Sequence, residues 1–118
     1  MQSILIVDDD EVFAKNLEKN LLLEGYRTSV AFSGQDAIAI IQSQKPDILI
    51  CDLKLPDIDG DEIIKKTLEI SPDTLSFVVS AYVDESVEDK LKKMGIRGLL
   101  YKPVVFDDVT AMICQNKK

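Results

Sequence analysis

Four short apolar runs constrain the fold of this chain most strongly, because each ends at a polar residue and is followed by a helical pattern. The runs are Ile4–Val7, Ile48–Cys51, Phe77–Val79 and Leu99–Tyr101. A run in which polar and apolar residues do not alternate is typical of a strand buried on both faces of a parallel sheet. The chain is therefore predicted to be an α/β protein.

The alternation of these runs with helical patterns predicts five βα units in one domain, residues 1–118. A further strand, Arg27–Ala31, is more polar than the others, which suits the edge of a sheet. Right-handed crossovers then favour a five-stranded parallel sheet of order 2-1-3-4-5 between two layers of helices, a flavodoxin-like (βα)5 fold. The expected strands are Ser3–Val7, Arg27–Ala31, Ile48–Cys51, Thr74–Val79 and Gly98–Tyr101.

Helical spacing and capping residues predict how the connecting helices lie. In the third helix, Ile63, Ile64 and Leu68 are expected to face the core. Asp10 and Asp59 stand where helices are predicted to begin, and we interpret both as N-terminal caps.

Polar residues follow the apolar runs, at the ends that a parallel sheet brings to one edge. Asp8 and Asp9 follow the first run, Asp52 follows the second, and Ser80 and Lys102 follow the last two. Ligands of open α/β sheets bind at this edge, where the winding of the sheet reverses. Clustered carboxylates repel one another, so the site is expected to bind a cation. Oxygen-only ligands indicate a hard cation, and few fixed carboxylates with room for waters and a phosphate favour Mg²⁺ over Ca²⁺, with Mn²⁺ as the substitute. With the metal and Lys102 in place, Asp52 is a candidate nucleophile for a phosphoryl group.

Two of these residues have ordinary structural alternatives. A serine at this point is more commonly a helix N-cap, a role that suits Ser80 as well as a hydrogen bond to a phosphoryl oxygen does. A lysine is usually a solvated surface residue, but Lys102 follows a buried strand and precedes Pro103. A cis bond between Lys102 and Pro103 would aim the ammonium inward.

Composition excludes several classes of protein. A net charge of −7 argues against direct binding of nucleic acid, and the absence of histidine removes histidine catalysis and most zinc sites. Cys51 and Cys114 have no metal-ligand partner at a useful spacing, so we interpret both as reduced core thiols. No segment is long enough to span a membrane and no signal peptide precedes the first strand, so we expect a cytoplasmic protein with no membrane contact.

The residues at the sheet edge resemble the receiver domain of two-component response regulators over essentially the whole chain. The resemblance is specific because five features must occur together. These are Asp8-Asp9, Asp52, the loop Leu55-Pro56-x-x-Asp59-Gly60, Ser80-Ala81 and Lys102-Pro103.

The resemblance implies that Asp52 accepts a phosphoryl group from a phosphohistidine on a sensor histidine kinase or phosphotransfer protein. Asp9 would bind Mg²⁺ directly, Asp8 mainly through water, and Asp52 and the backbone carbonyl of Lys54 would complete the protein ligands. Ser80, the backbone N–H of Ala81 and Lys102 would contact the phosphoryl oxygens. Pro56, Gly60 and Pro103 would fix the backbone around the site.

Phosphorylation is implied to shift an existing equilibrium and to remodel the surface of the last two helices and the strand between them. In the family, the switch often pairs the hydroxyl residue, here Ser80, with an aromatic residue in that strand, whose ring swings inward when the hydroxyl residue moves. This chain has Leu99 at the aromatic position, so the resemblance does not extend to the aromatic part of the switch. The family often has Phe where this chain has Val104. Lys54 and Tyr82 flank the route to the site and are expected to tune the rate of dephosphorylation.

The other implied partners are an output domain or target protein and, on phosphorylation, a second copy of the chain. The domain would assist its own phosphorylation and dephosphorylation without being a conventional enzyme.

The main rival interpretation is a phosphohydrolase of the haloacid-dehalogenase type. In that family Asp8 would be the nucleophile, Asp10 the acid–base residue, and Asp107-Asp108 the last acidic motif. Asp107 and Asp108 stand near the expected start of the last helix and do not directly end a convincing strand, and Asp52 would have no role. A receiver-like module that only binds proteins is a second rival. A flavodoxin-like binder of nucleotide or flavin is a third, which the lack of a glycine-rich loop after the first strand disfavours.

Overall fold

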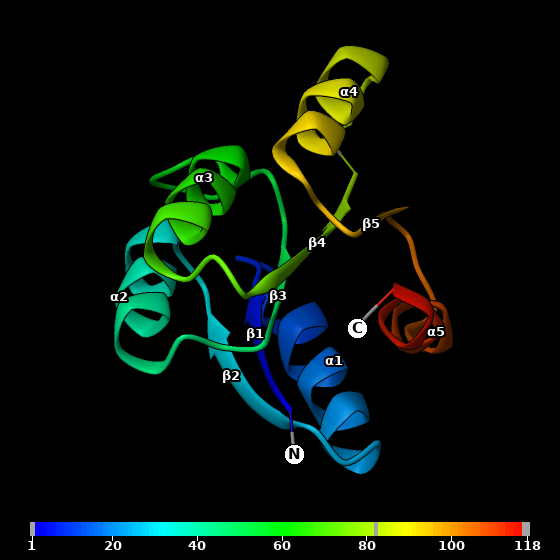
Figure 1. The fold of residues 1–118 in the computed structure, drawn as a ribbon. Helices are drawn as coiled ribbons and strands as arrows, with labels where there is room; N and C mark the ends of the chain where they lie inside the picture. The colour runs from blue at the N-terminus through cyan, green and yellow to red at the C-terminus, as the bar shows by residue number, and fades with distance from the viewer. Residues whose placement is uncertain (1, 82, 117–118) are drawn as a thin grey trace.

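Strands and helices alternate along the computed structural model, which describes residues 2–81 and 83–116. All the strand pairs are parallel, and the order is β2-β1-β3-β4-β5, as predicted (Figure 1). The strands are β1 (Ser3–Val7), β2 (Arg27–Ala31), β3 (Ile48–Cys51), β4 (Leu75–Ser80) and β5 (Gly98–Tyr101). The helices are α1 (Glu11–Leu23), α2 (Gly34–Gln44), α3 (Gly60–Ile70), α4 (Glu85–Met94) and α5 (Phe106–Asn116).

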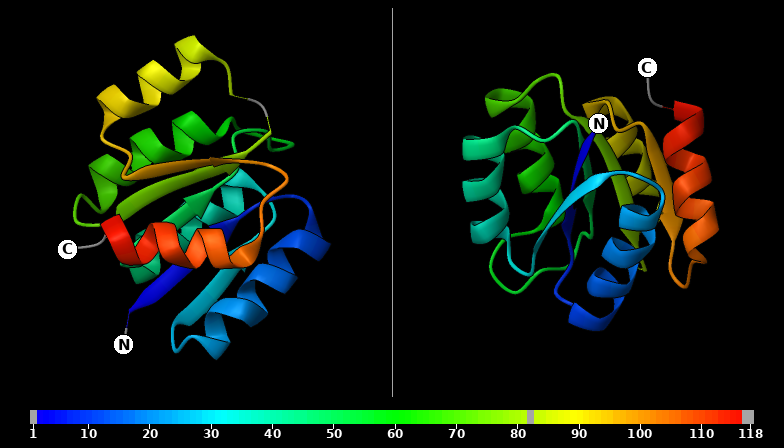
Figure 2. Two further views of the ribbon diagram at one scale, coloured as in Figure 1. Left: turned by 90° about the vertical axis from the view of Figure 1, so that its right-hand side faces the viewer. Right: turned by 90° about the horizontal axis from the view of Figure 1, so that it is seen from below.

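Helices cover both faces of the sheet, which explains why the central strands β1, β3 and β4 are mostly apolar on both faces. α1 and α5 lie on one face, and α2, α3 and α4 lie on the other (Figure 2). Successive residues of β1 point to opposite faces, so Ile4 and Ile6 pack under α1 and α5 while Leu5 and Val7 pack under α2 and α3. The predicted flavodoxin-like three-layer fold is thus confirmed.

The structure corrects several details of the predicted elements. β4 begins at Leu75 and includes Ser80, and α5 begins at Phe106. Leu68 is 39% exposed, and Thr67 takes the inward position instead. The buried Thr67 hydroxyl donates a hydrogen bond to the Ile63 carbonyl, so this polar side chain is satisfied inside the core. Only half of the cysteine prediction holds, because Cys51 is buried whereas Cys114 is exposed.

Capping residues mark where three of the helices begin or end. Asp10 accepts a hydrogen bond from the Phe13 N–H, as a helix cap should. Asp59 occupies the N-cap position of α3, but its side chain makes no capping hydrogen bond. Gly95 ends α4 with a φ of 95°, a conformation that favours glycine.

Candidate functional site

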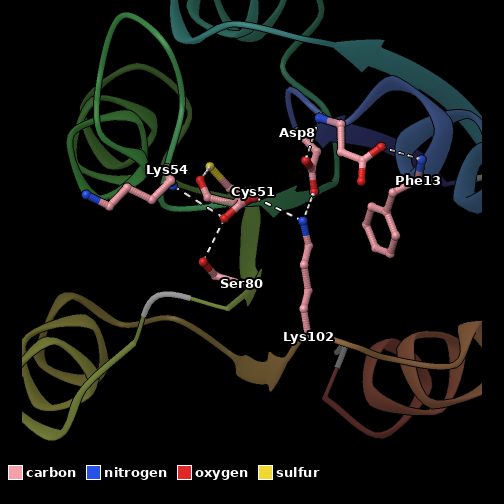
Figure 3. A network of polar contacts seen from close by, with 8 residues as sticks. Asp8, Phe13, Cys51, Lys54, Ser80 and Lys102 are labelled. Atoms are coloured by element: carbon pink, nitrogen blue, oxygen red, sulfur yellow. Dashed lines mark hydrogen bonds and ion pairs between the residues drawn. The ribbon is translucent and has the colours of Figure 1, made fainter.

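Parallel pairing brings the predicted site residues to one edge of the sheet (Figure 3). Val7 pairs with Cys51, so Asp8 and Asp52 leave neighbouring strands at the same level. Ser80 pairs with Tyr101, and the Lys102 N–H donates to the Ser80 carbonyl at 3.0 Å. Four strand ends therefore deliver two carboxylates, a hydroxyl and an ammonium to one place.

Asp8, Asp9 and Asp52 form an acidic cluster in which one carboxylate oxygen of each residue lies within 4.8 Å of the others. Asp8 and Asp52 are buried, at 2% and 5% exposure, whereas Asp9 is exposed. Burial raises the pKa of Asp8, and the charge of Asp52 acts in the same direction. Hydrogen bonds from Lys102 and from the Asp10 N–H oppose that shift without cancelling it.

The ammonium of Lys102 bridges the two buried carboxylates. Its Nζ lies 2.6 Å from Asp8 Oδ2 and 3.0 Å from Asp52 Oδ2. Burial alone would lower the pKa of Lys102, but the hydrogen bonds to Asp8 and Asp52 outweigh that effect, so the pKa is raised and the side chain stays charged. The peptide bond between Lys102 and Pro103 is cis.

One ammonium compensates only part of the charge of three clustered carboxylates. The donors that remain are carboxylate oxygens, which are the ligands that hard divalent cations prefer. The residues present therefore fit a metal such as Mg²⁺ on the charge and chemistry of the cluster.

The carboxylate of Asp52 is held on both of its oxygens. Asp52 Oδ1 accepts hydrogen bonds from the Ser80 hydroxyl at 2.6 Å and from the Lys54 N–H at 3.3 Å, and Oδ2 faces Lys102. Ser80 is fully buried and is not a helix cap, since Asp84 caps α4. Ala81, beside Ser80, is exposed.

The side chain of Lys54 is exposed and extends away from the acidic cluster (Figure 3). Lys54 thus approaches Asp52 through its backbone N–H rather than through its charge. Tyr82, the other residue expected to tune the site, lies outside the described residues.

Gly60 is required for the close approach of α3 to the backbone after β3. Its N–H donates to the Leu53 carbonyl at 2.9 Å. A Cβ at position 60 would collide with the Asp52 carbonyl oxygen and would lie 2.7 Å from the Leu53 Cα. Pro56 lies in the exposed loop between β3 and α3.

Two residues of the site region were missed by sequence reasoning. Asp57, in the loop after β3, accepts hydrogen bonds from the Gly34 and Gln35 N–H groups at 2.8 and 2.9 Å, at the start of α2. Phe13 places its ring 4.6 Å from the Lys102 ammonium. The only available signal was position, since Asp57 lies in the loop after the acidic strand end and Phe13 lies one helical turn beyond the acidic pair.

The structure does not place the acidic residues where the rival phosphohydrolase interpretation requires them. Asp10 is an exposed helix cap, and Asp107 and Asp108 lie in the exposed first turn of α5 rather than at a strand end.

Leu99, at the position where the family often has an aromatic residue, packs against the core beneath α2, α3 and α4. Within the described part of the chain, no helix combines the length and the apolar character that crossing a membrane requires.

A family model described as the response regulator receiver domain matches residues 4–114. A response regulator receiver protein of Anaeromyxobacter sp. (strain Fw109-5) is 32% identical over 104 residues, which cover 88% of this chain and 44% of that protein. Sporulation initiation phosphotransferase F of Bacillus subtilis (strain 168) is 31% identical over 108 residues, covering 92% of this chain and 87% of that protein. Transcriptional regulatory protein ZraR of Salmonella typhimurium is 30% identical over 104 residues, covering 88% of this chain and 24% of that protein.

The chain thus spans less than half of the Anaeromyxobacter and Salmonella relatives and most of the Bacillus subtilis protein. Among solved structures, a CheY-like receiver domain protein from Methanospirillum hungatei JF-1 superimposes with a TM-score of 0.94 at 27% identity, over 98% of this chain and 92% of that one. A Burkholderia pseudomallei response regulator, solved with a phosphorylated aspartic acid, a calcium ion and citrate, superimposes with a TM-score of 0.89 at 26% identity, over 95% of this chain and 66% of that one.

Proposed function

The chain belongs to the family of response regulator receiver domains of two-component signalling, and from this premise we propose that Asp52 is its phosphoacceptor. One observation carries the assignment to this residue. Asp52 is the buried carboxylate of the acidic cluster that Ser80, Lys102 and the Lys54 N–H together hold in place. A carboxylate fixed in this way can attack phosphorus in line, because phosphoryl transfer depends mostly on positioning and charge neutralisation.

In the proposed reaction, an Asp52 oxygen forms a bond to phosphorus while the bond between phosphorus and the donor nitrogen of a phosphohistidine breaks. The leaving imidazole keeps the bonding electron pair. The Ser80 hydroxyl, the Ala81 N–H and the Lys102 ammonium are the proposed contacts for the phosphoryl oxygens. Ser80 and Lys102 already hydrogen-bond Asp52, so each needs only to exchange a carboxylate oxygen for a phosphoryl oxygen.

The metal proposed for the cluster is Mg²⁺, with Mn²⁺ as the substitute. Asp8, Asp9, Asp52 and the backbone carbonyl of Lys54 would hold it. When bound, the metal would neutralise negative charge on the phosphoryl group and on the carboxylates.

Receiver domains are signalling modules, so the proposed output is a changed protein surface. A sensor histidine kinase or a phosphotransfer protein would supply the phosphoryl group in the cytoplasm. The surface of α4, β5 and α5 would then contact an output domain, a target protein or a second copy of the chain. Leu99 stands in β5 where the family often has an aromatic residue, so this remodelling would proceed without a moving aromatic ring there.

Intact mass spectrometry after incubation with acetyl phosphate and Mg²⁺ tests the assignment. We expect one phosphoryl adduct on the wild type, none on Asp52→Asn, and none when EDTA removes the metal. Asp73 is an exposed carboxylate just before β4, at the opposite end of that strand from Ser80. Asp73→Asn is therefore the matched control and should form the adduct normally.

Two other outcomes would assign the protein differently. An adduct that survives Asp52→Asn but disappears with Asp8→Asn would favour the phosphohydrolase. The absence of an adduct with both acetyl phosphate and a phosphorylated histidine donor would favour a module that only binds proteins.

Lys54 and Tyr82 are further proposed to tune the lifetime of the phosphoryl group. Replacing both with alanine while timing the loss of the adduct tests this role. Dephosphorylation at the wild-type rate would exclude it.

A further inference from the structure

We propose that Phe13 is a positioning residue, which holds the ammonium of Lys102 in place for phosphoryl transfer to Asp52. The proposal rests on the proposed function of Asp52. It adds an aromatic side chain from α1 to the site. The acidic residues Asp8 and Asp9 come from the loop before this helix.

The geometry is that of a cation–π contact. Lys102 Nζ lies 4.6 Å from the centre of the Phe13 ring, within the distance of about 6 Å at which the negative face of a ring attracts a cation. Figure 3 shows the ring of Phe13 beside Lys102, on the side away from Lys54 and Ser80. The ammonium is thus held by Asp8, Asp52 and an aromatic ring together.

Both the backbone and the ring of Phe13 are held in place. Its backbone N–H donates to Asp10 Oδ1 at 3.1 Å, and the Asp10 N–H donates to Asp8 Oδ1 at 2.9 Å. Its ring packs against Phe106, the first residue of α5, with ring centres 5.9 Å apart and planes inclined by 55°. The ring under Lys102 is therefore tied both to the acidic loop and to the helix that follows Lys102 in sequence.

The chemistry of the site explains why an aromatic residue suits this position. A carboxylate at position 13 would attract Lys102 strongly, but it would compete with Asp52 and with the incoming phosphoryl oxygens. A leucine would fill the space without attracting the charge. A phenyl ring attracts the cation while remaining neutral, so the full positive charge of Lys102 stays available to the phosphoryl group.

This role matters most during the transfer step. As the Asp52 oxygen bonds to phosphorus and the donor's leaving group departs, the ammonium must shift from a carboxylate oxygen to a phosphoryl oxygen. A side chain that is already held at its end has less freedom to lose in that step. Removing the ring should therefore slow transfer without weakening capture of the donor.

Proton NMR of the metal-free protein tests the contact directly. A ring face shields the protons above it, so the ε-methylene protons of Lys102 should resonate upfield of an ordinary lysine in the wild type and in Phe13→Tyr. The upfield shift should disappear in Phe13→Leu. Phe32→Leu is the matched control, because Phe32 packs against the same core as Phe13 but its ring lies near a different lysine, Lys15.

Phosphorylation by acetyl phosphate over a range of concentrations tests the consequence. For Phe13→Leu we expect the maximal rate constant to fall about two- to fivefold, the size expected for one cation–π contact, with an unchanged half-saturating donor concentration. Phe13→Tyr and Phe32→Leu should retain the wild-type rate constant. Recovery of the rate by tyrosine would distinguish the ring from simple filling of space.

An unchanged Lys102 resonance in Phe13→Leu would overturn the contact, and a lost upfield shift with a wild-type rate constant would overturn the positioning role. If the wild type forms no adduct at all, the proposed phosphoacceptor role fails. The NMR comparison would still decide in that case whether the ring holds the ammonium.

Discussion

Asp8 carries a charge that its surroundings disfavour. Burial and the neighbouring Asp52 raise its pKa above 3.8, despite the hydrogen bond from Lys102. The folded state therefore binds this proton more tightly than the unfolded state does, and the stability of the metal-free domain falls as the pH rises through the raised pKa.

Asp8→Asn should accordingly stabilise the metal-free protein at neutral pH, by about 0.5–2 kcal/mol, the range typical of a single stabilising substitution. The gain should shrink as the pH falls and vanish below 3.8, where the wild-type carboxyl is protonated in both states. Urea unfolding in EDTA at several pH values measures it.

Two comparisons sharpen this prediction. Asp9→Asn removes a charge that is exposed to water, so it should change stability less than Asp8→Asn. Added Mg²⁺ should stabilise the wild type more than Asp8→Asn, because the variant lacks one of the four groups proposed to hold the metal. A variant at position 8 that is less stable than the wild type in EDTA would show that the salt bridge to Lys102 outweighs the cost of burial.

Gly60 is needed for space rather than for an unusual backbone angle. Gly60→Ala should destabilise the domain by about 1–3 kcal/mol, since the new methyl group must displace the backbone of Asp52 and Leu53. The same displacement should slow phosphorylation of Asp52.

Gly95→Ala is the control for this prediction. At Gly95, an added Cβ meets nothing within 4 Å and only the positive φ opposes it, so this variant should lower stability but leave the phosphorylation rate unchanged. Equal rates in the two variants would contradict this account.

At the scale of elements, Asp57 ties the loop after β3 to the beginning of α2. Hydrogen bonds from Gly34 and Gln35 lower the pKa of Asp57, so the stability that this carboxylate contributes is present above 3.8 and is lost as the pH falls through the lowered pKa. Asp57→Ala should therefore increase amide hydrogen exchange at Gly34 and Gln35.

Ser33→Ala provides the matched comparison for Asp57→Ala. The Ser33 hydroxyl accepts a hydrogen bond from the Asp36 N–H in the same turn of α2, so Ser33→Ala should increase amide exchange at Asp36 instead of at Gly34 and Gln35. The same pattern of exchange in both variants would mean that the first turn of α2 opens as one unit and that Asp57 holds no separate part of it.

The sequence predicts the strands and the site better than it predicts the contacts between helices. Asp8 and Asp52 meet because parallel strands place their carboxyl ends together, which follows from the apolar runs alone. The inward face of α3 was ambiguous, because positions 67 and 68 both lie on the side of Ile63 and Ile64. Thr67 takes the inward place since its hydroxyl can bond to the Ile63 carbonyl. The contact between Phe13 and Lys102 depends on how α1 packs beside α5, which no local pattern encodes.

At the scale of the whole molecule, stability is distributed unevenly over the fold. α4 buries only Leu91, whereas every residue of β3 is buried. α4 also lies at the far end of its helix layer from α2 (Figure 1). Elements with few buried apolar contacts open at lower free energy than the core.

Native-state hydrogen exchange should therefore show that α4 opens well before β1 and β3. The amides of α4 should exchange at a free energy below that of global unfolding, while those of β3 should exchange only through global unfolding. Protection of α4 equal to that of β3 would contradict the prediction and would argue against α4 as an easily remodelled surface.

The contact between Lys102 and Asp8 joins residues that are 94 positions apart in the chain. During synthesis, the acidic cluster leaves the ribosome long before the lysine that compensates part of its charge. An incomplete chain would hold Asp8 and Asp52 without their ammonium, and its β5 would not yet be in the sheet. If Asp52 is the phosphoacceptor and Lys102 contacts the phosphoryl group, as proposed above, Asp52 should accept a phosphoryl group only after translation has passed Lys102 and β5 has joined the sheet, so truncated chains should not be phosphorylated.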